Sequence, residues 1–498
     1  MKRTYENAIR LLESRKRPAR PKTPASRAPM DQEAPTNNQA SVKGIPSLLG
    51  MSEWLGALGH TDTEIARLNL IHVSGTKGKG STCAFTRGFL SAHGRRTGFP
   101  RRVGLYTGPH LISTRERIQV DGGPITRESF AQYFFEVWDC LMAPNLELDT
   151  GGSTVIAGMK PRYLQFMALL AFHTFIRERV DAAIIEVNHG GEFDSTNVIQ
   201  SPVVTGISSL GLDHVAQLGS TLESIAWHKS GIFKFGAPAF AVIQEPGPAD
   251  VMSRRAFDRG TTVTFISANA SLPRDAGVLD VSVQRLNCSL ALELAKAFVS
   301  AKSPGSVLSD EDVQTGIRDF SLLGRFQVIS NGGLQWFVDG AHNTLSLEEA
   351  AKWFVKATIP GQNNRCCRAV VFSHHSQGRD GLELVQCLAQ VLRSHKFSPE
   401  RVIFTTYKHT DPAGIDPAAP EEMDSELKGL LAAYASAWKE VDPHTVVTIE
   451  PSIETAINTV RRLGNYDGGM QTLITGSLHL VGEALAVLDP SLRECKCK

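Results

Sequence analysis

One stretch of the chain combines the residue types that bind phosphate groups. Three glycines alternate with two lysines, and hydroxyl side chains follow directly. Glycine lets backbone N–H groups approach phosphate oxygens, lysine adds positive charge, and a hydroxyl group can bind Mg²⁺. The stretch therefore predicts a loop for nucleoside triphosphate binding, with these residues: Gly75, Thr76, Lys77, Gly78, Lys79, Gly80, Ser81 and Thr82.

The spacing in this loop differs from that of the ordinary P-loop. In the pattern G-x-x-x-x-G-K-[ST], the lysine directly precedes the hydroxyl residue. In this chain Gly75 and Gly78 are closer together, and Gly80 separates Lys79 from Ser81. A flexible turn with two solvated lysines is the alternative. The coincidence of a strand, glycines, a lysine and hydroxyl groups favours phosphate binding.

The elements around the loop are those of a nucleotide-binding α/β fold. The apolar run 68–73 predicts a buried strand before the loop, and residues 83–93 can form a helix after it. A second apolar run, 180–187, delivers Glu186 near its carboxyl end. Parallel strands place ligands outside their carboxyl ends, so Glu186 is a candidate Mg²⁺ ligand.

A second polar segment follows the next predicted strand. Residues 202–210 read as a strand, and the segment 211–214 after it contains His214. A lone histidine usually has a structural role, but Glu186 ends another strand, so His214 becomes a second candidate metal ligand. Helices are predicted over the ranges 45–58, 63–67, 127–141, 161–179, 221–232 and 286–300.

The helix predicted over residues 221–232 carries a lysine on its apolar face. Lys229 follows Leu222 by seven residues and Ile225 by four, so the three share one face. Burial lowers the pKa of an ammonium group, and the neutral amine is the form that reacts with CO₂. A lysine that reaches solvent, or pairs with a carboxylate, is the alternative.

Length and composition indicate a globular protein with more than one domain. The 498 residues exceed what one core usually holds, and 42% hydrophobic with 21% charged residues is ordinary for such proteins. The predicted fold class is α/β, a parallel-sheet nucleotide-binding domain followed by a smaller Rossmann-like α/β domain. The expected division is 1–43 for a helix and disordered linker, 44–320 for the ATP-binding domain, and 321–498 for the second domain.

Charge and cysteine content limit the partners that we expect. A net charge of +1 argues against nucleic-acid and membrane binding, and no apolar run reaches the length of about 18 residues that a membrane span needs. The eight cysteines include no C-x-x-C pair, which is typical of free thiols in a reducing compartment. We expect a cytoplasmic monomer. The basic first residues leave a mitochondrial presequence open, although Glu6 and Glu13 count against it.

Taken together, the motifs resemble those of the folylpolyglutamate synthases, a family of the Mur-ligase superfamily. The resemblance extends from about residue 5 to about residue 488, apart from the linker after Arg15. It rests on the phosphate-binding loop and on residues 109–111, 115–118, 190–191, 194–197, 212–214, 228–232, 324–327, 339–343 and 475–477.

The resemblance implies an ATP-dependent ligase that adds L-glutamate to the γ-carboxylate of a tetrahydrofolyl-(poly)glutamate through an acyl phosphate. It implies ATP and Mg²⁺, with K⁺ or another monovalent cation as a further candidate ion. The implied catalytic residues are Lys79, Lys229 and His214. The implied metal ligands are Ser81, Glu186, His214 and a carbamylated Lys229. Further ATP contacts would come from Arg325, Asp339 and His342, with Ser477 nearby.

The chain departs from the family pattern at three places near the implied chemistry. Gly108 stands where the family has a serine that helps bind Mg²⁺, Asn188 and His189 replace a Gly-Ile pair, and Gln377 occupies a position that is often acidic. A dihydrofolate synthase and a ligase for another carboxylic acid therefore remain alternatives. A catalytically weak protein that binds nucleotide or folate is a third. A GTPase is disfavoured because the sequence lacks an N-K-x-D motif.

Overall fold

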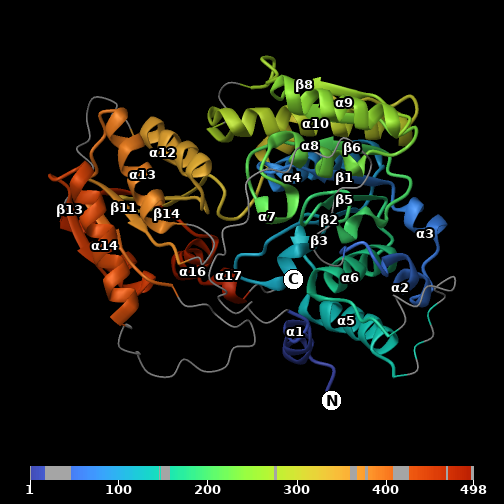
Figure 1. The fold of residues 1–498 in the computed structure, drawn as a ribbon, viewed down its shortest axis with the longest axis horizontal. Coiled ribbons are helices and arrows are strands. Elements are labelled where there is room, and N and C mark those ends of the chain that lie inside the picture. The colour runs from blue at the N-terminus through green and yellow to red at the C-terminus, as the bar shows by residue number, and fades with distance from the viewer. Residues whose placement is uncertain are drawn as a thin grey trace. The chain divides into compact units, whose positions relative to one another are not determined.

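The chain divides into two compact units, which Figure 1 traces from blue to red. One unit consists of Met1–His110 with Arg115–Ser321, and the other of Leu111–Thr114 with Leu322–Lys498. The computed structural model describes residues 2–16, 46–144, 146, 148, 158–273, 277–358, 367–375, 380–407, 425–466 and 469–494. The predicted linker, apart from Lys16, and Gln377 lie outside the described residues.

An eight-stranded sheet forms the centre of the first unit. Its strand order is β4-β3-β2-β5-β1-β6-β7-β8, and all pairs are parallel except β2–β3 and β3–β4 at one edge. The central strands are buried along their whole length, as expected where helices cover both faces of a sheet. The strands are β1 (Leu70–Ser74), β2 (Val103–Tyr106), β3 (Ile118–Val120), β4 (Gly123–Pro124), β5 (Ala182–Glu186), β6 (Val204–Ile207), β7 (Ala239–Val242) and β8 (Val263–Ile266).

Helices pack on both faces of this sheet. Helices α4, α10 and α11 share one apolar core with it, and α1, α2, α5 and α6 share another, so that α10 and α6 lie on opposite sides of the strands in Figure 1. The helices are α1 (Tyr5–Glu13), α2 (Met51–Ala57), α3 (Asp62–Arg67), α4 (Lys79–Thr97), α5 (Arg127–Leu141), α6 (Tyr163–Arg177), α7 (Val215–Leu218), α8 (Leu222–Lys229), α9 (Pro246–Asp258), α10 (Ser282–Lys302) and α11 (Asp310–Arg318), with 3₁₀ turns η1 (Thr114–Arg117), η2 (Ser195–Val198), η3 (Ser230–Ile232) and η4 (Gly277–Asp280).

The second unit is a smaller α/β layer structure. Its six-stranded sheet has the order β13-β12-β11-β14-β10-β9, in which only β9 is antiparallel to its neighbour. Helices α15 and α16 pack on one apolar face of this sheet. Its elements are β9 (Gln327–Asn331), β10 (Leu334–Val338), β11 (Cys367–Phe372), β12 (Arg401–Phe404), β13 (Val446–Ile449), β14 (Met470–Thr475), α12 (Thr344–Thr358), α13 (Gly381–Ser394), α14 (Ser425–Val441), α15 (Ile453–Tyr466), α16 (Leu478–Leu488) and α17 (Ser491–Glu494).

The predicted fold class is confirmed, while several element ends differ from the prediction. Helix α5 has the predicted bounds, but α2 begins at Met51 rather than near residue 45, after a left-handed Gly50. Strand β6 ends at Ile207 and not at residue 210, because the backbone beyond it bonds to the phosphate-binding loop. The prediction did not include α9 and β8. No helix within the described ranges is long and apolar enough to cross a bilayer.

Helix α4, which begins in the phosphate-binding loop, is held against α11 by close packing and by a buried carboxylate. A Cβ atom on Gly88 would lie 2.7 Å from the Gly316 carbonyl oxygen, so the two helices approach where both lack side chains. Asp312 is 2% exposed and accepts hydrogen bonds from Arg96 at 2.6 and 3.0 Å. Burial raises the pKa of Asp312, but the bonds from Arg96 and Ser309 outweigh it and lower the pKa below its usual value.

We expect Asp312→Asn to lower the free energy of unfolding of the first unit by about 1–3 kcal/mol, because a buried carboxylate loses its charge-assisted hydrogen bonds while Arg96, which is 40% exposed, stays solvated. Because the folded-state pKa is depressed, this contribution is full above the ordinary pKa of about 4 and is lost as pH falls through the folded-state pKa. Asp319→Asn is the matched control, since Asp319 pairs with Arg95 at 2.8 Å on an exposed surface and should contribute less than about 1 kcal/mol. Urea unfolding of the two variants checks this, and equal losses would contradict it.

Candidate active site

The phosphate loop, Gly75–Thr82, consists of the turn between β1 and α4 and the first residues of α4. Gly78 is the N-cap of α4 with a left-handed φ of 85°, and Lys79 is the first helical residue. The 19-residue helix directs its first N–H groups and the positive end of its dipole toward the loop. Ser81 and Thr82 lie in the first helical turn and are buried. The predicted order of strand, loop and helix is confirmed.

Gly75 is the residue that lets the loop approach the end of β6. A Cβ atom at this position would lie 1.9 Å from the Ser208 hydroxyl oxygen, and its φ of 143° is one that side chains with a Cβ rarely adopt. Gly78 is similarly confined, because a Cβ there would lie 2.1 Å from the side-chain oxygen of Asn287. Both glycines are therefore required by space and by backbone conformation.

The segment after β6 fixes the first half of the loop. The backbone N–H groups of Thr76 and Lys77 donate to the Ser209 carbonyl at 2.9 and 3.1 Å, and the Thr76 hydroxyl donates to the Gly211 carbonyl. The ammonium group of Lys77 lies 3.7 Å from the carboxylate of Asp213. The two lysines of the loop thus have different surroundings, and Lys77 is paired with a carboxylate.

Lys79 and Lys229 converge on one backbone oxygen. The Gly75 carbonyl accepts hydrogen bonds from Lys79 Nζ at 3.1 Å and from Lys229 Nζ at 2.7 Å. The predicted burial of Lys229 is confirmed, with 4% of the residue exposed. Burial, followed by the positive charge of Lys79, lowers the pKa of Lys229 well below its usual value. This cluster of positive charge is suited to an anion such as a triphosphate.

Glu186 lies beside this loop at the carboxyl end of β5. It stands opposite Val73 of β1 in the parallel register and is 4% exposed. One carboxylate oxygen accepts hydrogen bonds from the Thr107 hydroxyl and, at 3.2 Å, from the Gly108 backbone N–H. The end of β5 therefore presents a fixed carboxylate at the same edge of the sheet as the phosphate loop that follows β1.

Gly108, where the resemblance implies a serine, faces a guanidinium group. A Cβ atom at this position would lie 2.4 Å from an Nη atom of Arg117, whose Nε donates to His110 at 2.9 Å. Arg117 thus occupies the space beside Gly108, and a serine would require that side chain to move. Thr107 contacts Glu186 directly, so a hydroxyl group is still present at this carboxylate.

His214 lies in a loop rather than at a strand end. It is the exposed N-cap of the short helix α7, with a left-handed φ of 52°. Its ring contacts the ring of His189 at 4.3 Å between centroids. Burial, and then the nearby positive charges of His214, Lys229 and Lys79, lower the pKa of His189 to about 4. From the sequence, His189 is only a departure from the family pattern near the implied chemistry, without a role of its own, although its position three residues after Glu186 could have indicated one.

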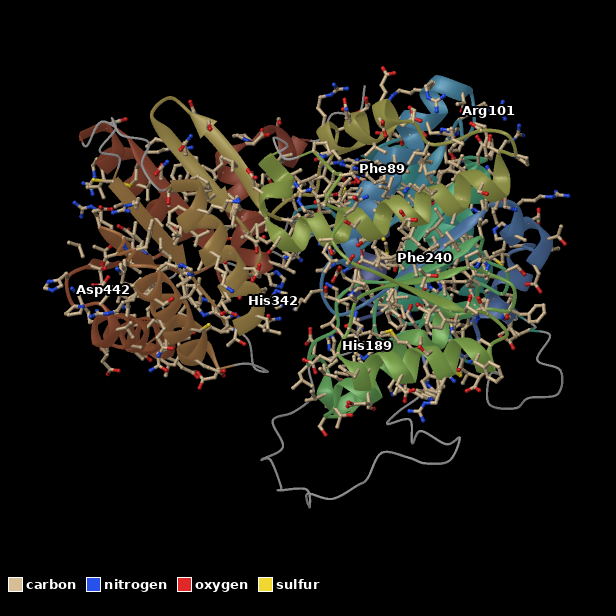
Figure 2. The ribbon with its side chains drawn as sticks, turned by 90° about the horizontal axis from the view of Figure 1, so that it is seen from above. Phe89, Arg101, His189, Phe240, His342 and Asp442 are labelled. Carbon is tan, nitrogen blue, oxygen red and sulfur yellow. The ribbon has the colours of Figure 1, made fainter. Side chains whose placement is uncertain are left out.

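The candidate residues of the second unit form a polar cluster of their own. Asp339, 3% exposed, follows β10 and accepts a hydrogen bond from the Phe326 backbone N–H at 2.9 Å, next to Arg325. His342, labelled in Figure 2, has its Nδ1 atom 2.9 Å from the Gly340 carbonyl oxygen. Ser477 caps helix α16. Arg325 precedes β9, while Asp339 and His342 follow β10. The Gly340 backbone N–H donates to the Gly324 carbonyl at 2.9 Å, which brings the two segments together.

The residues around Glu186 fit a magnesium ion only with help from a bound nucleotide. Glu186 and Ser81 supply the oxygen atoms that Mg²⁺ prefers. Over the described parts of the chain, no group of three or more His, Cys, Asp or Glu side chains is placed to hold a metal ion by itself. Phosphate oxygens and water would therefore have to complete the coordination.

Comparison with known proteins identifies the family. The chain is 38% identical over 464 residues to the folylpolyglutamate synthase of Neurospora crassa, covering 89% of this chain and 85% of that protein. It is 36% identical to the folylpolyglutamate synthase of Saccharomyces cerevisiae strain FostersO, covering 90% and 82%. This chain belongs to the folylpolyglutamate synthase family.

Two further findings concern the fold of this family. Residues 323–487 match the sequence profile described as dihydrofolate synthetase, C-terminal domain. The crystal structure of the Mycobacterium tuberculosis folylpolyglutamate synthase, complexed with ADP and AMPPCP, is 24% identical with a TM-score of 0.68 and covers 89% of this chain and 96% of that one. The likeness to this crystal structure supports the described fold for both units of the chain.

We expect Gly75→Ala to weaken ADP binding at least tenfold, because the new Cβ overlaps Ser208 and the backbone becomes strained by about 1–3 kcal/mol. Isothermal titration calorimetry measures the affinity, and a melting curve shows whether the variant is folded. Gly123→Ala in β4 is the control, since a Cβ there meets no atom within 4 Å. A G75A variant that binds ADP as the unmodified protein does would contradict this account of the loop.

Proposed function

We propose that this chain is an ATP-dependent ligase that adds L-glutamate to the γ-carboxylate of a tetrahydrofolyl-(poly)glutamate. The observation that carries the proposal is the phosphate loop with two converging lysines beside Glu186, in a member of the folylpolyglutamate synthase family. The AMPPCP and ADP complexes of the Mycobacterium tuberculosis relative support ATP as the nucleotide.

The reaction needs ATP because a carboxylate has no good leaving group. A carboxylate oxygen of the folate attacks the γ-phosphorus of ATP, and ADP leaves, giving an acyl phosphate. The amine of glutamate then attacks the acyl carbon, loses a proton and expels inorganic phosphate, giving the amide. The protein contributes positioning and stabilisation of the charge that develops on phosphate oxygens.

The residues of the first unit have distinct proposed roles in this chemistry. The N–H groups of the phosphate loop and the start of α4 bind the phosphates, and Lys79 stabilises negative charge on the β- and γ-phosphates. Ser81 and Glu186 would hold Mg²⁺, with His214 as a less preferred nitrogen ligand. Bound Mg²⁺ would supply charge neutralisation between the phosphates. K⁺ or another monovalent cation is a further proposed ion.

Lys229 is proposed to be carbamylated. Its lowered pKa favours the neutral amine that adds CO₂, and the positive charges of Lys79 and Lys77 would stabilise the resulting anion. The carbamate nitrogen keeps one N–H group, which can still donate to the Gly75 carbonyl. A carbamate could therefore replace the ammonium group without loss of that hydrogen bond.

The second unit is proposed to contribute to ATP binding through Arg325, Asp339 and His342. The match to the dihydrofolate synthetase C-terminal profile favours a second candidate function, the addition of glutamate to dihydropteroate. ADP release that depends on glutamate, measured with a tetrahydrofolate, with dihydropteroate and without an acceptor, separates the two ligases from a protein that only binds. We further propose that the protein acts as a monomer in the cytoplasm.

We expect Lys79→Ala to lower kcat about 10²–10³-fold, equivalent to about 3–4 kcal/mol, because one donor to developing charge is lost. Lys77→Ala should have a smaller effect, since Lys77 pairs with Asp213. Steady-state ligase assays at saturating ATP make the comparison. Near-normal activity of K79A would show that the loop assignment is wrong.

We expect Lys229→Ala to lose ligase activity and to regain part of it when a short carboxylic acid is added, because the acid fills the place of the carbamate. The matched control is Lys79→Ala, which removes the other lysine on the Gly75 carbonyl and should not respond to the acid. A crystal structure of active enzyme, prepared with bicarbonate and showing a bare amine at Lys229, would contradict the carbamate.

A further inference from the structure

The loop that follows β5 lies directly against the phosphate loop. The Ser74 hydroxyl, next to Gly75, donates to the Gly190 carbonyl at 2.7 Å. The Glu192 backbone N–H donates to the His228 carbonyl at 2.7 Å, beside Lys229. The loop of residues 188–192 therefore contacts both elements whose lysines converge on the Gly75 carbonyl.

Buried hydrogen bonds hold this loop in one conformation. Asp194, 3% exposed, accepts hydrogen bonds from the His189 and Thr196 backbone N–H groups, each at 2.9 Å. The Tyr106 hydroxyl donates to the side-chain oxygen of Asn188 at 3.0 Å, which fixes that amide with its oxygen toward Tyr106. The side chain of Asn188 and the backbone of His189 are thus held in place before any ligand binds.

Asn188 and His189 each have a side-chain nitrogen atom that is shielded from solvent and makes no hydrogen bond within the described part of the chain. These atoms are Asn188 Nδ2 and His189 Nε2. A buried polar atom without a partner destabilises the folded protein and is uncommon in native proteins. The ring of His189 contacts the ring of His214 at 4.3 Å between centroids. The neighbouring Asp213 lies 3.7 Å from Lys77, so His189 lies beside the segment that is paired with the phosphate loop.

We propose that Asn188 and His189 donate hydrogen bonds to the phosphoryl group that is transferred from ATP. This inference rests on the proposed ligase function and adds two residues to its phosphoryl site. The amide nitrogen can only donate, and the imidazole donates as its Nε2–H tautomer. Lys79 provides positive charge for the phosphoryl oxygens, and the two neutral donors give the group a fixed orientation without adding a further positive charge.

The test compares two nucleotides that differ in the γ-phosphoryl group. AMPPCP carries a γ-phosphonate and ADP does not. We expect His189→Ala to weaken AMPPCP binding about tenfold, the usual effect of one hydrogen bond to a charged group, and to leave ADP binding unchanged in the presence of Mg²⁺. His189→Gln keeps an N–H donor near the position of Nε2 and should recover most of the AMPPCP affinity. Asn188→Ala should also weaken AMPPCP alone.

Isothermal titration calorimetry on the full chain provides these affinities, with His60→Ala as the control. His60 is also partly buried, but its Nε2 atom lies 2.8 Å from His173 Nδ1, so neither affinity should change. Equal weakening of ADP and AMPPCP in H189A, or no change in either, would overturn the proposal. A raised KM for the acceptor acid with unchanged AMPPCP affinity would also overturn it and assign the donors to the acceptor. Because nucleotide binding needs no acceptor, absence of folate ligation would defeat only the proposed function.

Discussion

The carbonyl oxygen of Gly75 accepts hydrogen bonds from two lysine side chains, and the site depends on this arrangement. Burial, and then the repulsion between two ammonium groups on one acceptor, lower the pKa of Lys229. An anion bound beside them removes that repulsion. The same geometry therefore favours a bound triphosphate and a carbamate on Lys229, because each adds negative charge where the protein has concentrated positive charge.

This arrangement is possible because the ends of three parallel strands meet at one edge of the sheet. Strand β1 leads into the phosphate loop, β5 ends at Glu186, and the segment after β6 binds the loop through the Ser209 carbonyl. The Ser74 hydroxyl binds the Gly190 carbonyl from the loop after β5. Each loop is thus held by its neighbours, so the donors at this edge are ordered without a ligand.

The second unit repeats one feature of the first. In both units a buried carboxylate follows a strand of the sheet or ends it, and accepts a hydrogen bond from a backbone N–H group: Glu186 from Gly108, and Asp339 from Phe326. Such a bond fixes the orientation of the carboxylate. The polar cluster of each unit is therefore held in place by the strands and backbone of its own sheet, and not by long side chains at the surface.

The sequence by itself determined the α/β class, the phosphate loop, the strand that carries Glu186 and the burial of Lys229, because these features depend on local periodicity and on glycine spacing. It also carried the family resemblance, because those motifs lie in one order along the chain. Only the tertiary structure decided that Lys77 pairs with Asp213 while Lys79 meets Lys229, and that His189 lies against His214. These pairs of residues are 25 to 150 positions apart, so their contacts follow from how strands β1, β5 and β6 are ordered in the sheet. Local patterns do not encode that order, and for this reason the partners of each charged group could not be read from the sequence.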